Sequence, residues 1–378
     1  MKRKILLCIM VALCIFTFTG ILFAAGKEEE VKEAVEEYPE KAPYVVDFSW
    51  GTFKLSPRIV KKIENNEPLN FVLSYQTLSS VAAAQEHEMG MLKAAEWAEE
   101  EYGVKINVRL IGPTETDAPK QIAEIESILN ANQADVLSIQ PPSKHGFEAI
   151  IQKGLDMGVP VVTCNSDAPD STRIAYYGPN DTPSGNGITV AKHAQAWAKE
   201  NGFNFDSIAI TTGDTTAVWA QGRMGGFFNT VQKDLPGVKI YGTPTNAAVS
   251  TGWNSTDMYT KIKAFLTGHP DVNFIFNSDW GGVSASQAVI DLGREGECFV
   301  IAYNTDEKIL SFVGKGTTYI ATADQDMPGQ SEAWVKGMAR FLFEGEVPDG
   351  PMQYTPVMMV TSENADEVRK DLEEMGVL

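Results

Sequence analysis

The chain has few of the residues and motifs that carry covalent or metal chemistry. Its 378 residues include only four cysteines and four histidines. The histidines, His87, His145, His193 and His269, stand alone on predicted helices or loops, without the spacing of zinc ligands. A GxSxG nucleophile elbow, a phosphate-binding GxxxxGKS/T loop and a GxGxxG turn after the first strand are also missing. The sequence therefore predicts no enzyme, no metal site and no cofactor.

Positive charge is scarce. Lys and Arg number 31 against 50 Asp and Glu, which gives a formal net charge of −19 at pH 7. Such a balance opposes contact with phosphate backbones and with anionic lipids. We therefore expect no nucleic-acid partner.

Only one apolar run approaches membrane length. Lys2-Arg3-Lys4 precede an almost uncharged stretch from Ile5 to Ala25, which is the layout of a secretory signal peptide. We expect residues 1–25 to be a signal peptide and the remaining chain to be periplasmic or otherwise extracytoplasmic. Because a span needs only about 20 residues, an uncleaved membrane anchor is the alternative. A lipoprotein is disfavoured because the bulky Leu13 precedes Cys14, where a small residue is preferred.

The two cysteines outside this run, Cys164 and Cys298, are far apart in sequence, and we expect two free, buried thiols. Residues 26–66 begin with an acidic stretch that has few large apolar side chains. Such a composition does not build a core, so it predicts an exposed linker. Ser56-Pro57 then opens a short amphipathic helix at the end of this region.

From Phe71 onward, short apolar runs alternate with segments of helical period. The predicted strands are residues 71–75, 105–111, 136–139, 161–164, 208–211, 238–241, 274–276, 300–303, 319–323 and 357–360. Helices separate them, and a long helix is predicted over residues 328–343. This alternation predicts an α/β fold with parallel sheets covered on both faces. Two successive units of similar size predict two similar lobes.

Polar side chains follow the buried strand 161–164. Asn165 and Asp167 come just after it, Arg173 comes a few residues later, and a Gly-Pro-Asn segment at 178–180 is expected to redirect the chain. Open α/β sheets bind ligands at the carboxyl ends of their strands. This segment is therefore a candidate ligand site, and an ordinary polar loop is the alternative.

Several short motifs follow one another along the chain: Gly112-Pro113-Thr114-Glu115 with Lys120-Gln121-Ile122 and Ile125-Glu126, Gly158 to Thr163, Ser166 to Ser171 with Arg173, His269 to Val272, and Thr322 to Gln325. Together they resemble those of the sugar-binding proteins of bacterial ABC transporters, of the ribose- and galactose-binding type that is related to autoinducer-2-binding proteins. The resemblance covers the chain from about Phe71 to the C-terminus. It implies two Rossmann-like lobes joined by a three-stranded hinge, with the ligand in the cleft between them. The implied lobes are residues 67–179 plus 326–354 and residues 180–325 plus 355–378.

The positions that match the family's ligand site combine planar polar groups with aromatic rings. A sugar needs both, since its hydroxyls lie around its edge and its C–H faces lie above and below. The implied ligand-binding residues are Tyr75, Gln76, Asn165, Asp167, Arg173, Trp219, Gln221, Trp253, Asp279, Trp280, Asn304 and Gln325. Trp253 falls where the family places a stacking aromatic ring.

Each of these residues also has a structural interpretation. The tryptophans are of a type more often found in a core, and Arg173 is equally compatible with a surface salt bridge. Asp279 and Asp306 both precede predicted helices and are suited to capping them. We prefer ligand binding for Asp279 and capping for Asp306.

The resemblance implies a monomeric solute-binding protein that delivers a sugar or sugar-like molecule to an ABC transporter permease. The alternative is a sensory protein that hands the same ligand, or an autoinducer-2-like signal, to a chemoreceptor or sensor kinase. Ribose- and galactose-binding relatives have aspartates where this chain has Asn165 and Asn304. An asparagine adds two hydrogen-bond donors that an aspartate lacks. We therefore predict a neutral polyhydroxylated ligand other than free ribose or galactose.

Overall fold

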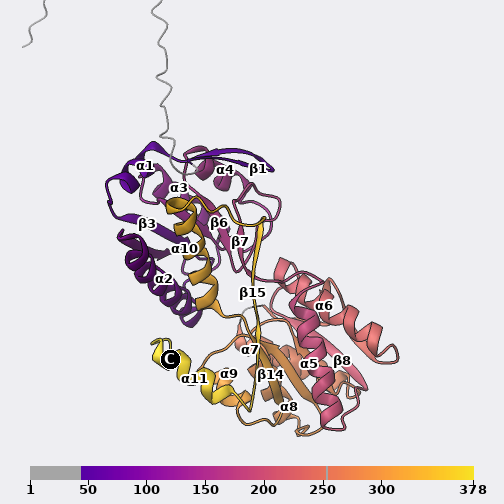
Figure 1. Ribbon diagram of the computed structural model, residues 1–378. Helices are drawn as coiled ribbons and strands as arrows, with labels where there is room; N and C mark the ends of the chain where they lie inside the picture. The colour runs from indigo at the N-terminus through magenta and orange to yellow at the C-terminus, as the bar shows by residue number, and fades with distance from the viewer. Residues whose placement is uncertain (1–43, 253) are drawn as a thin grey trace, which may run out of the picture. The chain divides into compact units, whose positions relative to one another are not determined.

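The computed structural model describes residues 44–252 and 254–378 (Figure 1). The predicted signal peptide, the first part of the predicted linker and Trp253 lie outside the described residues. Within those two ranges, no helix combines the length and the apolar character needed to cross a membrane.

The described chain opens with a hairpin that the sequence analysis did not predict. Strand β1 (Val45–Phe48) pairs antiparallel with β2 (Gly51–Lys54). Two strands of four residues, mostly exposed, show too little apolar alternation to stand out in the sequence. The helix that follows, α1 (Pro57–Glu64), starts after Ser56 as predicted, with the proline in its first turn.

A six-stranded, fully parallel sheet follows. Its strands are β3 (Leu69–Ser74), β4 (Ile106–Ile111), β5 (Val136–Ile139), β6 (Val161–Cys164), β7 (Tyr176–Pro179) and β15 (Met352–Thr355), in the order β15-β7-β6-β5-β3-β4. Its helices are α2 (Val81–Tyr102), α3 (Ala118–Asn130), α4 (Glu148–Asp156) and α10 (Met327–Phe343). Every residue of β5, β6 and β7 is buried, as expected for parallel strands covered on both faces.

The second sheet has eight strands. They are β8 (Ser207–Thr212), β9 (Lys239–Thr243), β10 (Asn246–Ala247), β11 (Val249–Ser250), β12 (Phe274–Asn277), β13 (Phe299–Tyr303), β14 (Tyr319–Asp324) and β16 (Met358–Thr361). The main order is β10-β9-β8-β12-β13-β14-β16, and β11 pairs with β8. Only β10 and β16 run antiparallel to their neighbours. The helices are α5 (Asn186–Glu200), α6 (Val218–Asp234), α7 (Ser255–Gly268), α8 (Gly282–Asp291), α9 (Glu307–Val313) and α11 (Ala365–Glu374).

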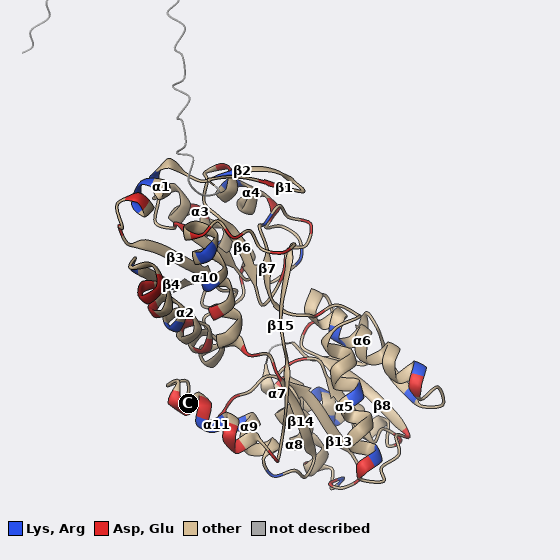
Figure 2. Cartoon of the chain, in the orientation of Figure 1, with Lys and Arg blue, Asp and Glu red and all other residues tan. Residues whose placement is uncertain are grey.

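Alternate residues of the central strands supply the two faces of this sheet. Ile208 and Ile210 of β8 join the core that includes α5 and α6, whereas Ala209 between them joins the core that includes α7, α8, α9 and α11. Strand residues point to opposite faces in turn, so one apolar run serves two cores. Figure 2 shows that acidic residues occur along α2 and α11.

The chain passes between the two sheets three times. It leaves the six-stranded sheet after β7, returns after β14 to helix α10, and passes again between β15 and β16. Trp334 of α10 packs on the first sheet, with its ring 6.0 Å from that of Phe71. The parallel α/β fold is therefore as predicted. Strands β7 and β15 were not predicted. Gly178 and Pro179 of the expected redirecting segment are the last two residues of β7, and the chain leaves the sheet directly after them.

Candidate functional site

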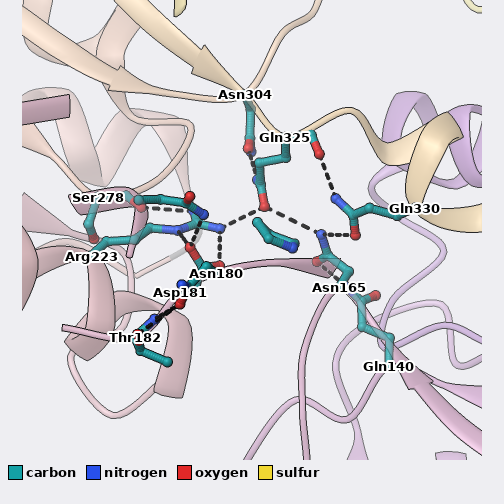
Figure 3. A network of polar contacts seen from close by, with 12 residues as sticks. Gln140, Asn165, Asn180, Asp181, Thr182, Arg223, Ser278, Asn304, Gln325 and Gln330 are labelled. Carbon is teal, nitrogen blue, oxygen red and sulfur yellow. Dashed lines mark hydrogen bonds and ion pairs between the residues drawn. The ribbon is translucent and has the colours of Figure 1, made fainter. Parts of the chain in front are cut away.

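Three of the predicted site residues lie at strand ends and join one network of hydrogen bonds (Figure 3). Asn165 directly follows β6, Asn304 follows β13, and Gln325 follows β14. Asn165 and Asn304 have φ values of 62° and 73°, in the left-handed region that asparagine tolerates better than most residues. The sharp turn after each strand thus sets an amide side chain at the edge of the sheet.

Arg223 of α6 fixes the orientation of the central amide. Its Nη2 donates to Gln325 Oε1 at 2.6 Å. Because a guanidinium can only donate, Gln325 must turn its oxygen towards Arg223 and its nitrogen away. That nitrogen donates to Asn304 Oδ1. Asn304 Nδ2 then has no acceptor among the residues that the structure describes.

Asn165 is held on both sides of its amide. Its Nδ2 donates to Gln325 Oε1 at 3.3 Å and to Gln330 Oε1 at 3.0 Å, and its Oδ1 accepts from Gln140 Nε2. Gln330 is itself fixed, since its Nε2 donates to the main-chain oxygen of Gln325 at 2.8 Å. Both amide functions of Asn165 are therefore used within the protein.

The guanidinium of Arg223 is buried against a carboxylate. Nε and Nη2 donate to the two oxygens of Asp181 at 2.8 and 2.6 Å, and the side chains of Arg223 and Asp181 are 3% and 7% exposed. Nη1 donates to Ser278 O at 3.1 Å, and the ring of Tyr303 lies 4.2 Å from the guanidinium. Burial opposes the charge of Arg223, but Asp181 outweighs it and raises the arginine pKa. The cation is thus neutralised locally, and the network as a whole suits an uncharged ligand.

Asp167 and Arg173 form a second buried pair. Arg173 Nε lies 2.5 Å from Asp167 Oδ1, and Thr163 Oγ1 donates to the same oxygen at 2.7 Å. Burial raises the pKa of Asp167, while Arg173 and Thr163 act in the opposite direction. The alternative of a surface salt bridge for Arg173 is wrong, because both side chains are buried.

The aspartates before α8 and α9 bind main-chain nitrogens. Asp306 accepts from Ile309 N at 2.6 Å and caps α9, as predicted. Asp279 is buried and accepts from Gly281 N at 3.0 Å, Thr212 Oγ1 at 3.3 Å and the nitrogen of Gly213. These bonds account for the burial of Asp279 without a ligand.

The remaining predicted residues lie near these groups or in the cores. Tyr75 is buried with its ring 5.3 Å from that of His87, and burial raises its pKa. Gln76 follows it and is partly buried. The guanidinium of Arg223 lies 5.0 Å from the ring of Trp219.

Two more predicted residues are engaged by the second lobe's own elements. Gln221 donates to Thr215 O at 3.0 Å, and Trp280 packs against the core that includes α8. Within the described parts of the chain, no group of three or more His, Cys, Asp or Glu side chains is arranged to hold a metal ion.

The family described as a periplasmic binding protein domain matches residues 78–346. The chain belongs to this family. The match covers well over half of the sequence and confirms the type of protein that the motifs resemble. No curated protein matches the sequence significantly.

Solved structures share the two-lobed fold of the periplasmic binding proteins. GanP, a glucose-galactose binding protein from Geobacillus stearothermophilus, is 24% identical, covers 79% of this chain and 99% of its own, and gives a TM-score of 0.64. A sugar-binding protein of a sugar ABC transporter from Bacillus halodurans is 22% identical, covers 80% and 99%, and gives 0.67. A periplasmic solute-binding protein from Actinobacillus succinogenes, solved with bound D-allose, is 20% identical, covers 79% and 99%, and gives 0.64.

Four residues of the network were missed in the sequence of this periplasmic binding protein: Gln140, Asp181, Arg223 and Gln330. Gln140 directly follows β5, so the strand-end rule that found Asn165 applies equally to it. Arg223 lies one helical turn after Trp219, on the helix that had already been selected. Asp181 and Gln330 carry no such signal, since only the fold brings them to the strand ends.

Proposed function

We propose that this periplasmic binding protein captures a neutral sugar or sugar-like solute and delivers it to the permease of an ABC transporter. The observation that carries the proposal is the uncommitted amide nitrogen of Asn304, at the edge of a network whose other polar groups largely satisfy one another. A free donor beside a locally neutralised cation suits a neutral ligand with hydroxyl or carbonyl oxygens. The glucose-galactose and D-allose proteins of the same fold support a sugar as the solute.

The proposed lobes are residues 67–179 plus 326–354 and residues 180–325 plus 355–378. The ligand would lie between them, in contact with the predicted residues, including Trp253 as the stacking ring. A ligand that bridges both lobes binds their closed arrangement better and shifts the population towards it. The protein would act outside the cytoplasm, as a monomer, without turnover and without a cofactor.

The ligand class follows from the two asparagines. Asn165 is occupied by Gln140, Gln325 and Gln330, which leaves Asn304 to face the ligand with a donor. We propose a different monosaccharide, a cyclic polyol or a sugar derivative with an added carbonyl, rather than free ribose or galactose. A ligand carbonyl would accept from Asn304 Nδ2 without having to reorient a hydroxyl.

Calorimetric titration against a panel of sugars, inositols and sugar lactones tests the function. We expect saturable one-site binding of a neutral polyhydroxylated compound, with ribose and galactose ranked below it. Amino acids and short peptides serve as controls. Binding of one of these controls but of no sugar or polyol would overturn the proposed function, whereas ribose or galactose ranked first would overturn only the ligand class.

A further inference from the structure

A hollow of about 340 Å³ lies beside the passage that follows β14. Residues of α2, of the β14–α10 passage, of the β15–β16 passage and of α11 line it. None of the residues labelled in Figure 3 lines it, although Asp324 and Asp326 flank Gln325 in the sequence. The hollow is within the size range of small-molecule sites. It is therefore a separate place for a ligand.

The charged side chains that line the hollow are all acidic. They are Glu86, Asp324, Asp326 and Asp371. Asp324 Oδ1 accepts from Asp326 N at 3.0 Å and from Thr305 Oγ1 at 3.3 Å, and Asp326 caps α10 through Gly329 N at 2.9 Å. These two carboxylates are thus partly satisfied by the protein.

Glu86 is the exception. It is 3% exposed, yet no described residue donates a hydrogen bond to it or forms an ion pair with it. Burial, together with the carboxylates of Asp324, Asp306 and Asp326, raises the pKa of Glu86 well above its ordinary value. An ionised carboxylate buried without a donor is costly, and the raised pKa means that Glu86 favours the neutral acid instead. A cationic donor supplied from outside the protein would stabilise the ionised form.

The lining also indicates the chemistry of that donor. Its other residues are apolar: Pro328, Pro356, Val357, Met358, Val368, Leu372 and Met375. A bare metal ion is disfavoured, because no metal-holding group of three or more His, Cys, Asp or Glu side chains occurs within residues 44–252 and 254–378. A hydrocarbon that carries a positively charged N–H donor matches both the acids and the apolar walls.

We propose that this hollow binds a small alkylammonium ion, with its nitrogen donating to Glu86 and its hydrocarbon packed against Val357 and Leu372. The site goes beyond the proposed sugar capture and does not depend on it.

Calorimetry on the full chain with 1,4-diaminobutane and n-butylamine tests the site. We expect saturable one-site binding that Glu86→Gln weakens by about 10- to 100-fold, the effect of losing one charge-assisted hydrogen bond. Glu88→Gln is the matched control, since Glu88 is exposed on the same helix. Asp371→Asn, at an exposed position of α11, should weaken binding by a smaller factor and leaves the buried residues unchanged.

The pH dependence of amine binding gives a second measurement, and a purely structural role of Glu86 would not produce it. The ionisable side chains near Glu86 are the carboxylates of Asp306, Asp324, Asp326 and Asp371 and the phenol of Tyr75. Binding of the ammonium ion ionises Glu86, so the amine should bind more tightly as pH rises from 5 towards 7, and Glu86→Gln should flatten this rise.

Three results would overturn the proposal. The first is that neither amine binds the wild-type chain saturably. The second is that the wild type and Glu86→Gln bind the amines equally well. The third is that Asn304→Asp, rather than Glu86→Gln, loses amine binding. The last result would move the amine to the network around Gln325.

Discussion

The ends of β6 and β13 are built alike but are used differently. Each buried strand ends in an asparagine with left-handed φ, Asn165 at 62° and Asn304 at 73°. Asn165 engages three side chains through both its oxygen and its nitrogen, whereas Asn304 receives one side-chain hydrogen bond at its oxygen. Asparagine thus occupies corresponding places in the two sheets, but Asn165 holds the network together whereas Asn304 leaves a donor free.

The difference originates at Arg223. A cation that only donates decides which way Gln325 points, and Gln325 then decides which atom of each asparagine faces it. Asn304 must present its oxygen to Gln325 Nε2, and Asn165 must present its nitrogen to Gln325 Oε1. Substitutions along this chain of contacts are expected to have effects that differ in size and kind.

The largest effect is expected from Arg223→Met. It leaves the buried Asp181 carboxylate without its partner and removes the donor that orients Gln325. We expect the free energy of unfolding, measured in urea, to fall by about 3–5 kcal/mol. The double variant Arg223→Met/Asp181→Leu should recover much of this loss, since no unpaired charge remains. A loss below about 1 kcal/mol would show that the pair is not buried as described.

Asn165→Asp should have the next largest effect. It sets a carboxylate oxygen against the Oε1 atoms of Gln325 and Gln330, neither of which can turn without losing its bond to Arg223 or to main chain. Two hydrogen bonds are replaced by repulsion, so we expect unfolding free energy to fall by about 2–4 kcal/mol. Thermal unfolding at pH 7 measures this. Stability equal to that of the wild type would remove Asn165 from its holding role.

Asn304→Asp is the matched substitution at the other strand end. It keeps the oxygen that accepts from Gln325 Nε2 and tolerates the left-handed φ, but it replaces the free donor with a charged carboxylate oxygen. We expect stability to change by less than about 0.5 kcal/mol. Affinity for the ligand should fall by roughly 5- to 15-fold, the value of one neutral hydrogen bond. Calorimetry on both aspartate variants compares the sites directly, and a reversed pattern would contradict the comparison.

The sequence predicts the regular elements well because their apolar patterns are local. The bounds of β5 and β6 agree with the structure, and the other predicted strands are shifted by only a few residues. Strand β7 was not predicted, because Gly178 and Pro179 are turn formers, yet pairing with β6 and β15 holds them in the sheet. At this position the pairing between strands determines the conformation, and the turn preference of the two residues does not.

The site was predictable only in part. Residues directly after strands, such as Asn165 and Asn304, follow a positional rule, and so does the overlooked Gln140. The Asp181–Arg223 pair joins the start of one helical region to the middle of the next, 42 residues along the chain, and no local pattern marks it. The bonds of Asp279 to Gly213 likewise depend on the packing of two loops.

Identifying what the protein carries is the most direct test of the central claim, that this chain captures a neutral polyhydroxylated solute. The full-length protein would be purified without added ligand and examined by mass spectrometry, first intact under native conditions and then after extraction of the bound compound. We expect a neutral sugar, polyol or sugar derivative whose binding Asn304→Asp weakens. An amino acid, a peptide or an anionic compound as the bound species would contradict it.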